Sequence, residues 1–153
     1  MEKSDIVITS AFRTAIGSLN GSLSSKTAPE LGSAVIKKCI ENSGLKKKEV
    51  DIVYMGQVLS AGVGQNPARQ ASILAGLSNE TTNTTVNQVC GSGLASIALA
   101  YNAIRCGDSN IIIAGGQESM SNAPHYIKLR KGEKVNEDKI KDSMIIDGLW
   151  DVY

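Results

Sequence analysis

The chain has 153 residues and a formal net charge of +1, from 16 basic and 15 acidic side chains. Hydrophobic residues make up 42% of the sequence, enough to bury one core, whereas the length is too short for two domains of ordinary size. The balanced charge and the 4% of aromatic residues argue against a protein that binds nucleic acid or a membrane surface through a basic face or base stacking.

The N-terminus and the cysteines bear on the compartment. The N-terminus is charged and lacks the apolar region of a signal peptide, and no apolar run approaches the ~20 residues of a membrane helix. Three cysteines without regular spacing argue against a disulfide framework or a zinc site. We therefore expect no metal, no membrane span and a reducing compartment, the cytoplasm.

Strand-like and helical segments alternate along the first part of the chain. The apolar run in residues 5–13 predicts a first strand that is buried on both faces. Thr27 and Glu30 have the spacing of a capping box, and Gly44 suits a helix end, so a helix is expected over 28–43. The later elements are predicted from the same signals: strands over residues 50–60, 81–89 and 110–116, and helices from Asn66-Pro67 to about Gly76 and from about 91 to 106.

This β-α-β-α-β-α-β order predicts an α/β domain with a largely parallel sheet over residues 1–118. The first half of the third helix carries no charge, which predicts burial on all sides. Its outer layer must then come from another chain or from a segment absent from this sequence. Residues 119–153 are charged and lack a clear period, which indicates a surface subdomain. We interpret the apolar cluster at the end of the chain as a truncation.

Cys90 lies where the third strand meets the third helix, next to Gly91 and Gly93. A helix N-terminus favours a thiolate over a thiol, and its free N–H groups can stabilise a developing oxyanion. These are the requirements of a covalent acyl-transfer nucleophile. The alternative is a buried filler residue, because free cysteine is often inert. For Cys39 and Cys106 we favour that structural role.

A dinucleotide-binding site is a further alternative for the same residues. The segment from Gly91 to Ser96 partly matches a G-x-G-x-x-G fingerprint, and Glu118 follows where a ribose-binding acid could lie. However, Ser96 replaces the third glycine, and the preceding strand ends in polar residues. The match is weak.

The segment NQVCGSGL around Cys90 resembles the nucleophile motif of thiolases, the acyl-CoA C-acetyltransferases. Other segments resemble thiolases in the same order and spacing over all 153 residues. They are SAFRTAIGSLNGSL (10–23), GQVLSAGVGQNPARQA (56–71), AGGQESMSNAPH (114–125), LRKGEK (129–134) and DGLWD (147–151). Gly91 and the residues before Cys90 resemble the biosynthetic, acetoacetyl-CoA branch.

The resemblance implies a reversible Claisen condensation of two acetyl-CoA molecules to acetoacetyl-CoA. Cys90 would carry the acetyl group, and coenzyme A would be substrate and product rather than a bound cofactor. Leu149 matches a position near the pantetheine arm, with a place in the core as the alternative. The implied fold has five layers, α-β-α-β-α, and subunits that form homodimers or tetramers.

The family's other catalytic residues, a His, a second Cys and an Asn, lie in its C-terminal half and have no counterpart here. His125, the single histidine, does not match the catalytic one, and we expect a surface or packing role for it. The chain alone could therefore be a non-catalytic folding or assembly unit. A 3-ketoacyl-CoA thiolase or a ketoacyl synthase relative is a further alternative.

Three other features have simpler interpretations. Gln65, Asn66 and Arg69 could brace the nucleophile loop or a dimer contact, but helix capping and a solvated face are favoured. Residues 115–119 could form an anion-binding nest, but a closely packed strand end is favoured. The run Lys128–Lys141 alternates with acids and is typical of a solvated face or a subunit contact.

Overall fold

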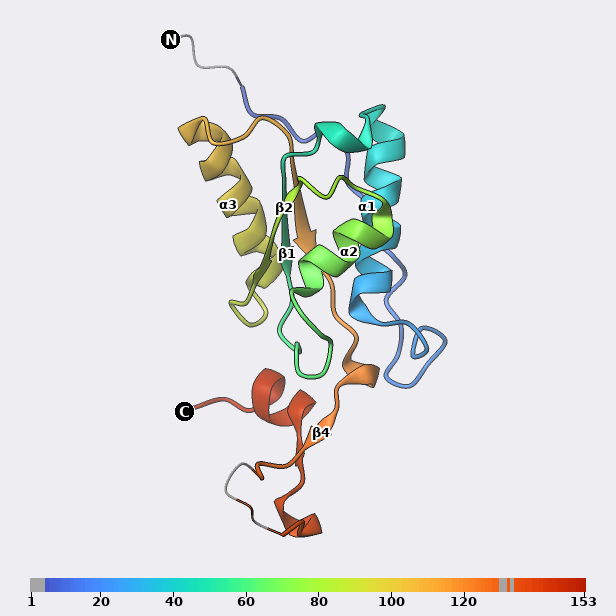
Figure 1. The fold of residues 1–153 in the computed structure, drawn as a ribbon, viewed down its shortest axis with the longest axis vertical. Coiled ribbons are helices and arrows are strands. Elements are labelled where there is room, and N and C mark those ends of the chain that lie inside the picture. The colour runs from blue at the N-terminus through green and yellow to red at the C-terminus, as the bar shows by residue number, and fades with distance from the viewer. Residues whose placement is uncertain (1–4, 130–131, 133) are drawn as a thin grey trace.

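The computed structural model describes residues 5–129, 132 and 134–153. Three strands form a parallel sheet in the order β2-β1-β3, and Figure 1 shows α1 and α2 on one face and α3 on the other. The elements are α1 (Ala28–Ser43), β1 (Ile52–Gly56), α2 (Pro67–Ala75), β2 (Thr82–Val86), α3 (Ser92–Cys106) and β3 (Ile112–Gly116). The α/β class and the parallel sheet are confirmed, although every strand is shorter than predicted.

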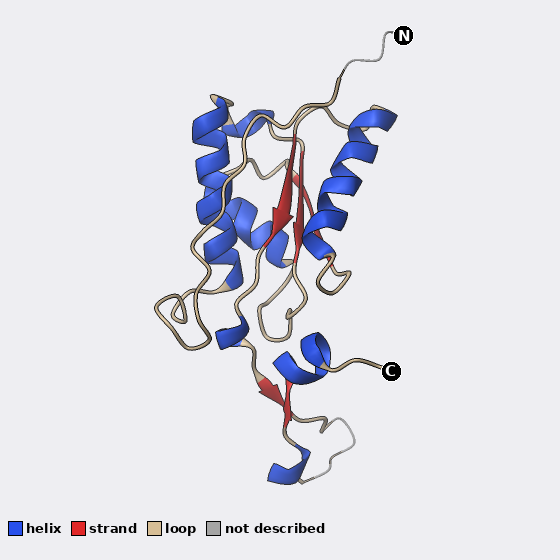
Figure 2. Cartoon of the chain, turned by 180° about the vertical axis from the view of Figure 1, so that it is seen from behind, coloured by secondary structure: helices blue, strands red, loops and turns tan. Residues whose placement is uncertain are grey.

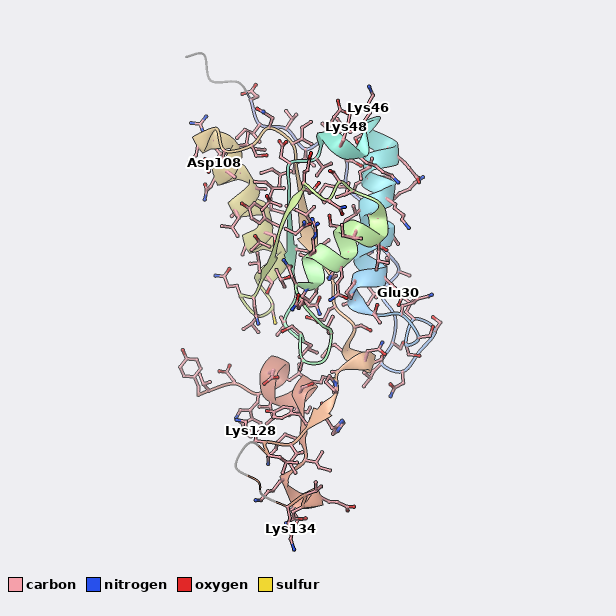
Figure 3. The ribbon with its side chains drawn as sticks, viewed as in Figure 1. Glu30, Lys46, Lys48, Asp108, Lys128 and Lys134 are labelled. Atoms are coloured by element: carbon pink, nitrogen blue, oxygen red, sulfur yellow. The ribbon has the colours of Figure 1, made fainter. Side chains whose placement is uncertain are left out.

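The described part of the chain after β3 lies beyond the carboxyl ends of the strands, in the lower part of Figure 1. It contains a short antiparallel pair, β4 (His125–Tyr126) with β5 (Lys141–Asp142), and a π-helical turn, η4 (Met144–Leu149). The remaining short elements are the 3-10 turns η1 (Lys47–Glu49), η2 (Met120–Asn122) and η3 (Glu137–Lys139). Exposed Lys128 and Lys134 lie on this lower part (Figure 3), whereas three further residues of the charged run, Arg130, Lys131 and Glu133, lie outside the described residues.

Successive side chains of β1 point to opposite faces of the sheet, and this alternation determines which helix each face packs against. Val53 and Met55 are buried on the face that packs against Ile36 and Ile40 of α1. Residues of opposite parity, including Gly56, point toward α3 because successive side chains alternate across a strand. The main core therefore lies between the sheet and α1/α2, and the α3 face is left for close backbone packing.

Local signals set the helix ends. Thr27 and Glu30 form the predicted capping box, and Gly44 ends α1 in the left-handed conformation with φ of 71°. Asn66 caps α2, its Oδ1 accepting from the Arg69 N–H at 3.2 Å. The Arg69 guanidinium donates to two carbonyl groups of the loop before β2, both at 2.9 Å. The capping role favoured for Asn66 is confirmed.

The prediction of a strand over residues 5–13 is wrong for this structure. The segment is extended but forms no strand (Figure 2), and Val7 and Ile8 are 69% and 78% exposed. A strand needs a hydrogen-bonded neighbour. Within the described residues, no backbone hydrogen bond joins this segment to β3, the last strand at that edge. A cleft of about 150 Å³ lies among residues 12–14, α1 and the end of β3.

In this chain α3 is buried on one side only, as expected if its outer layer comes from another chain or from a segment absent from this sequence. The side toward the sheet is buried through small residues spaced four, four and three apart: Ser92, Ser96, Ala100 and Ala103. The opposite side is open to solvent, with Leu94 74% exposed and Ile97, Leu99 and Tyr101 also exposed. No layer of the described residues covers that apolar face, so burial of α3 on all sides stays a prediction that depends on a partner for this face.

Candidate functional site

Cys90 is an exposed, free cysteine in the turn between β2 and α3. Gly91 is the N-cap of α3, and Ala95 N–H donates to its carbonyl at 2.8 Å. The N–H groups of Gly93 and Leu94 have no hydrogen-bond partner within the described part of the chain. These free donors and the helix dipole make a favourable environment for a negative charge beside the thiol. The predicted place of the thiol, at a helix N-terminus, is confirmed.

Val89, directly before Cys90, has a φ of +49°. A β-branched residue in this left-handed region is a genuine outlier that costs about 1–3 kcal/mol. Side chains on both sides hold it. Asn87 Oδ1 accepts from the Val89 N–H at 3.0 Å, and the Ser92 hydroxyl donates to the Val89 carbonyl at 2.6 Å. The same hydroxyl accepts from the Gln88 N–H at 2.8 Å, so it ties the turn from two directions.

Two glycines at strand ends let the first turn of α3 approach the sheet. A Cβ on Gly56 would lie 2.6 Å from the carbonyl carbon of Ser92, and one on Gly116 would lie 3.5 Å from the Gly93 Cα. At Gly93 itself, a Cβ would meet nothing within 4 Å, so this glycine leaves open space near the thiol. The predicted close backbone packing after β3 is confirmed.

Cys90 and Leu149 line the same cleft, although 59 positions separate them in the sequence. The cleft has a volume of about 440 Å³, and its other walls include Val58 and Leu59 after β1 and Glu118 after β3. Leu149, at the end of η4, is 57% exposed. The alternative that Leu149 is a core residue is therefore wrong.

Glu118 is the titratable acid in the cleft wall. Its Oε2 accepts from the Val58 N–H at 2.8 Å and its Oε1 from the Leu59 N–H at 3.2 Å. Burial raises the pKa of this carboxyl group above its ordinary value, and the two backbone hydrogen bonds act in the opposite direction. Because both oxygens are bound to the chain's own backbone, Glu118 is not presented to a ribose. The dinucleotide-binding alternative has no support in this geometry.

The other chemically capable side chains lie elsewhere. His125 is exposed, with its Nε2 3.8 Å from a carboxylate oxygen of Asp142, and it does not line the cleft. Cys39 and Cys106 are free thiols outside the cleft. In residues 5–129, 132 and 134–153, no three His, Cys, Asp or Glu side chains are grouped so that they could hold a metal ion. The helices of that same part are too short or too polar to cross a membrane.

Sequence reasoning missed the residues that hold the site together. It did not assign roles to Asn87 and Ser92, and it treated Glu118 only as a candidate ribose ligand. One signal was available: a Gly-Gln pair ends both β1 and β3, at residues 56–57 and 116–117. Such a repeat at neighbouring strand ends indicates that the two ends are matched.

The segment of the chain that matches known proteins includes all the residues of this site. Residues 6–153 match the family model described as "Thiolase, N-terminal domain". The chain is 55% identical over 150 residues to an acetyl-CoA acetyltransferase of Cupriavidus necator and 54% identical over 150 residues to one of Pseudomonas aeruginosa. A third acetyl-CoA acetyltransferase, of Rhizobium meliloti, is 52% identical over 153 residues.

These alignments cover nearly all of this chain but a smaller part of the relatives. They include 97% to 100% of the chain and 38% or 39% of each relative. The chain thus spans about two fifths of the length of the curated relatives it matches.

Proposed function

Because the chain belongs to the thiolase family through its N-terminal domain, we propose that it carries the acyl-accepting cysteine, Cys90, of an acetyl-CoA C-acetyltransferase. The observation that most supports this role is the exposed thiol at the start of α3, facing a cleft of about 440 Å³. The names of the relatives supply the substrate, acetyl-CoA.

In the first step, the Cys90 thiolate attacks the carbonyl carbon of acetyl-CoA. The bond between this carbon and the Cys90 sulfur forms, the bond to the sulfur of coenzyme A breaks, and coenzyme A leaves as a thiol after it takes a proton. The negative charge on the carbonyl oxygen at the tetrahedral stage is suited to N–H donors such as those of Gly93 and Leu94. Gly93, which adds no side chain, keeps the approach to the sulfur open.

In the second step, a base removes a methyl proton from another acetyl-CoA, and the resulting carbanion attacks the acetyl-cysteine. A carbon–carbon bond forms, the Cys90 thiolate leaves, and the product is acetoacetyl-CoA. The base is not supplied by the cleft described here, because His125 lies outside it and both oxygens of Glu118 are engaged. We therefore propose that this chain alone binds and accepts the acyl group but does not complete the cycle.

The remaining assignments follow from the family. Leu149 would contact the pantetheine arm of the thioester, since it lines the same cleft as Cys90. Residues 1–118 would form the N-terminal thiolase-fold domain and 119–153 the start of its loop domain. Coenzyme A thioesters would be substrates and products, with no resident cofactor. We also propose a homo-oligomer in the cytoplasm.

The experiment that tests this function joins residues 1–153 to the part of the Cupriavidus necator relative beyond its matched region. Thiolysis of acetoacetyl-CoA by this chimera should fall at least about a thousandfold with Cys90→Ser, because loss of a covalent nucleophile removes the acyl intermediate. Cys106→Ser is the matched control and should leave the rate within about twofold. An active Cys90→Ser chimera would eliminate the proposed role.

The same assay separates the alternatives. Turnover by the 153-residue chain without added segments, at the rate of the chimera, would contradict the proposal that it cannot complete the cycle. A requirement for an acyl carrier protein in place of coenzyme A would instead support the ketoacyl synthase alternative.

A further inference from the structure

We propose that Glu118 is a positioning residue, which fixes the turn at residues 57–59 and, through Leu59, the segment that places Leu149 in the cleft that it shares with Cys90. The inference rests on the proposed function, because it assigns this arrangement to the binding of the pantetheine arm of an acyl-CoA. Glu118 itself is not proposed to react.

The first argument is how the backbone of the turn is satisfied. The Val58 and Leu59 N–H groups donate to the two carboxylate oxygens of Glu118, at 2.8 and 3.2 Å. The Leu59 carbonyl accepts from Gln57 Nε2 at 2.9 Å. No backbone–backbone hydrogen bond reaches Val58 N–H or Leu59 N–H within the described residues. Buried backbone groups require partners, so these side chains determine the conformation of the turn.

The second argument is that Glu118 is held firmly. Gln117, the residue before it, donates from its backbone to the Gly56 carbonyl at 2.9 Å and continues the sheet ladder. Its buried side chain donates to Gln57 Oε1 at 2.9 Å and to the Pro67 carbonyl at 3.2 Å. The ends of β1 and β3 are thus tied by an amide pair, and Glu118 extends this tie to the turn. Burial raises the pKa of Glu118, and the hydrogen bonds from the Val58 and Leu59 N–H groups oppose this effect by stabilising the carboxylate.

The third argument is the contact between the turn and η4. Leu59 is buried, and a Cβ on Gly148 would lie 3.1 Å from its Cδ2 and 4.0 Å from Val58 Cγ1. The backbone of residue 148 therefore rests directly on the turn, a contact that glycine permits. Leu149 follows at once and lines the cleft with Cys90. A shift of the turn would consequently move the wall of the cleft.

Hydrogen–deuterium exchange of the 153-residue chain tests the positioning role directly. Glu118→Gln keeps the size of the side chain but has one acceptor oxygen, so its NH₂ group faces an N–H. We expect segments 57–60 and 144–150 to exchange about tenfold faster, the effect of one lost buried hydrogen bond, while β1 and α2 keep their protection. Glu80→Gln removes the same charge at an exposed position and should change neither segment. Unchanged exchange in Glu118→Gln, or an equal increase throughout the chain, would overturn the inference.

A second readout measures the effect on the acyl-CoA. The acetyl-CoA concentration for half-maximal acetylation of Cys90 should rise about fivefold or more in Glu118→Gln, while alkylation by the small reagent iodoacetamide stays within about twofold. General loss of structure would alter both reactions. An unchanged half-maximal concentration would refute the positioning role and leave the proposed function intact. If wild-type Cys90 accepts no acetyl group, the proposed function fails, and hydrogen exchange still decides the role of Glu118.

Gly148→Ala provides an independent variant at the other end of the connection. The added Cβ presses on Leu59 and should displace Leu149 while Glu118 keeps its hydrogen bonds. We expect the same increase in half-maximal acetyl-CoA concentration and no change in iodoacetamide reactivity. A wild-type acetyl-CoA response in this variant would contradict the proposed connection between the turn and η4.

Discussion

The hydroxyl of Ser92 holds the turn that carries Cys90, and its removal is the most informative perturbation of the site. Ser92 is 4% exposed, and its Oγ accepts from Gln88 N–H at 2.8 Å and donates to the Val89 carbonyl at 2.6 Å. Ser92→Ala removes both hydrogen bonds. The Val89 carbonyl still accepts a hydrogen bond from the backbone N–H of residue 92 at 3.1 Å, whereas the Gln88 N–H loses its only acceptor within the described residues.

The expected effect follows from these two losses. An unsatisfied, partly buried N–H costs about 1–3 kcal/mol. The left-handed conformation of Val89 costs about 1–3 kcal/mol, and fewer contacts then hold the residue in it. We expect Ser92→Ala to lower the free energy of unfolding by about 2 kcal/mol and Tm by about 4–8 °C. Relaxation of the turn should slow alkylation of Cys90 about tenfold, which corresponds to about 1.4 kcal/mol of lost preorganisation.

The assay combines urea unfolding with iodoacetamide alkylation of Cys90, measured by peptide mass. Ser96→Ala is the matched control, because Ser96 is also buried in α3 but its hydroxyl donates to the Ser92 carbonyl within the helix. Its Cys90 should react as in the wild type. If Ser92→Ala reacted as fast as Ser96→Ala, the argument that this hydroxyl positions the thiol would be refuted.

Other substitutions test the glycine contacts, the strain and the acid dependence. Gly56→Ala should lower the free energy of unfolding by about 3 kcal/mol, because its Cβ would lie 2.6 Å from the Ser92 backbone, whereas Gly93→Ala should be neutral or stabilising by up to about 1 kcal/mol; equal urea midpoints would contradict this. Val89→Gly should change stability by less than about 1 kcal/mol, since relief of the left-handed strain offsets the flexibility of glycine, and a larger loss would argue against strain. In the loop before β3, two backbone N–H groups and a serine hydroxyl donate hydrogen bonds to the Asp51 carboxylate. These bonds hold the pKa of Asp51 below its ordinary value of 3.8. The stability that the Asp51 carboxylate contributes is therefore present above pH 3.8 and lost as the pH falls through the lowered pKa. Asp51→Asn should flatten the acid side of the curve of unfolding free energy against pH. An unchanged curve would disprove this source of acid dependence.

Local signals in the sequence predicted the helices well. The first helix has the predicted bounds, 28–43, because a capping box and a left-handed glycine act within a few residues of the chain. Strands depend on distant partners, so their prediction was less accurate. Residues 5–13 have the apolar pattern of a strand, yet no backbone hydrogen bond joins them to β3 within the described residues.

In the site, too, the local features were predictable from the sequence and the long-range contacts were not. The position of Cys90 follows from a strand, a cysteine and two glycines that lie within a few residues of one another in the sequence. The shared cleft with Leu149 could be expected only from the family resemblance, because no local pattern joins residues 59 positions apart. Likewise, the bonds from Glu118 to the turn at 58–59 span about 60 positions and depend on the pairing of β1 with β3. The repeated Gly-Gln pair at 56–57 and 116–117 hints at this register but does not predict the bonds from Glu118 to the turn.

Acetyl transfer from acetyl-CoA to the 153-residue chain, mapped by peptide mass, tests the central claim most directly. We predict one acetyl group on Cys90, sensitive to hydroxylamine as a thioester is, and none on Cys39 or Cys106 over the same time. A chain acetylated equally on all three cysteines, or on another residue with Cys90 unmodified, would contradict the assignment of Cys90 as the acyl-accepting nucleophile.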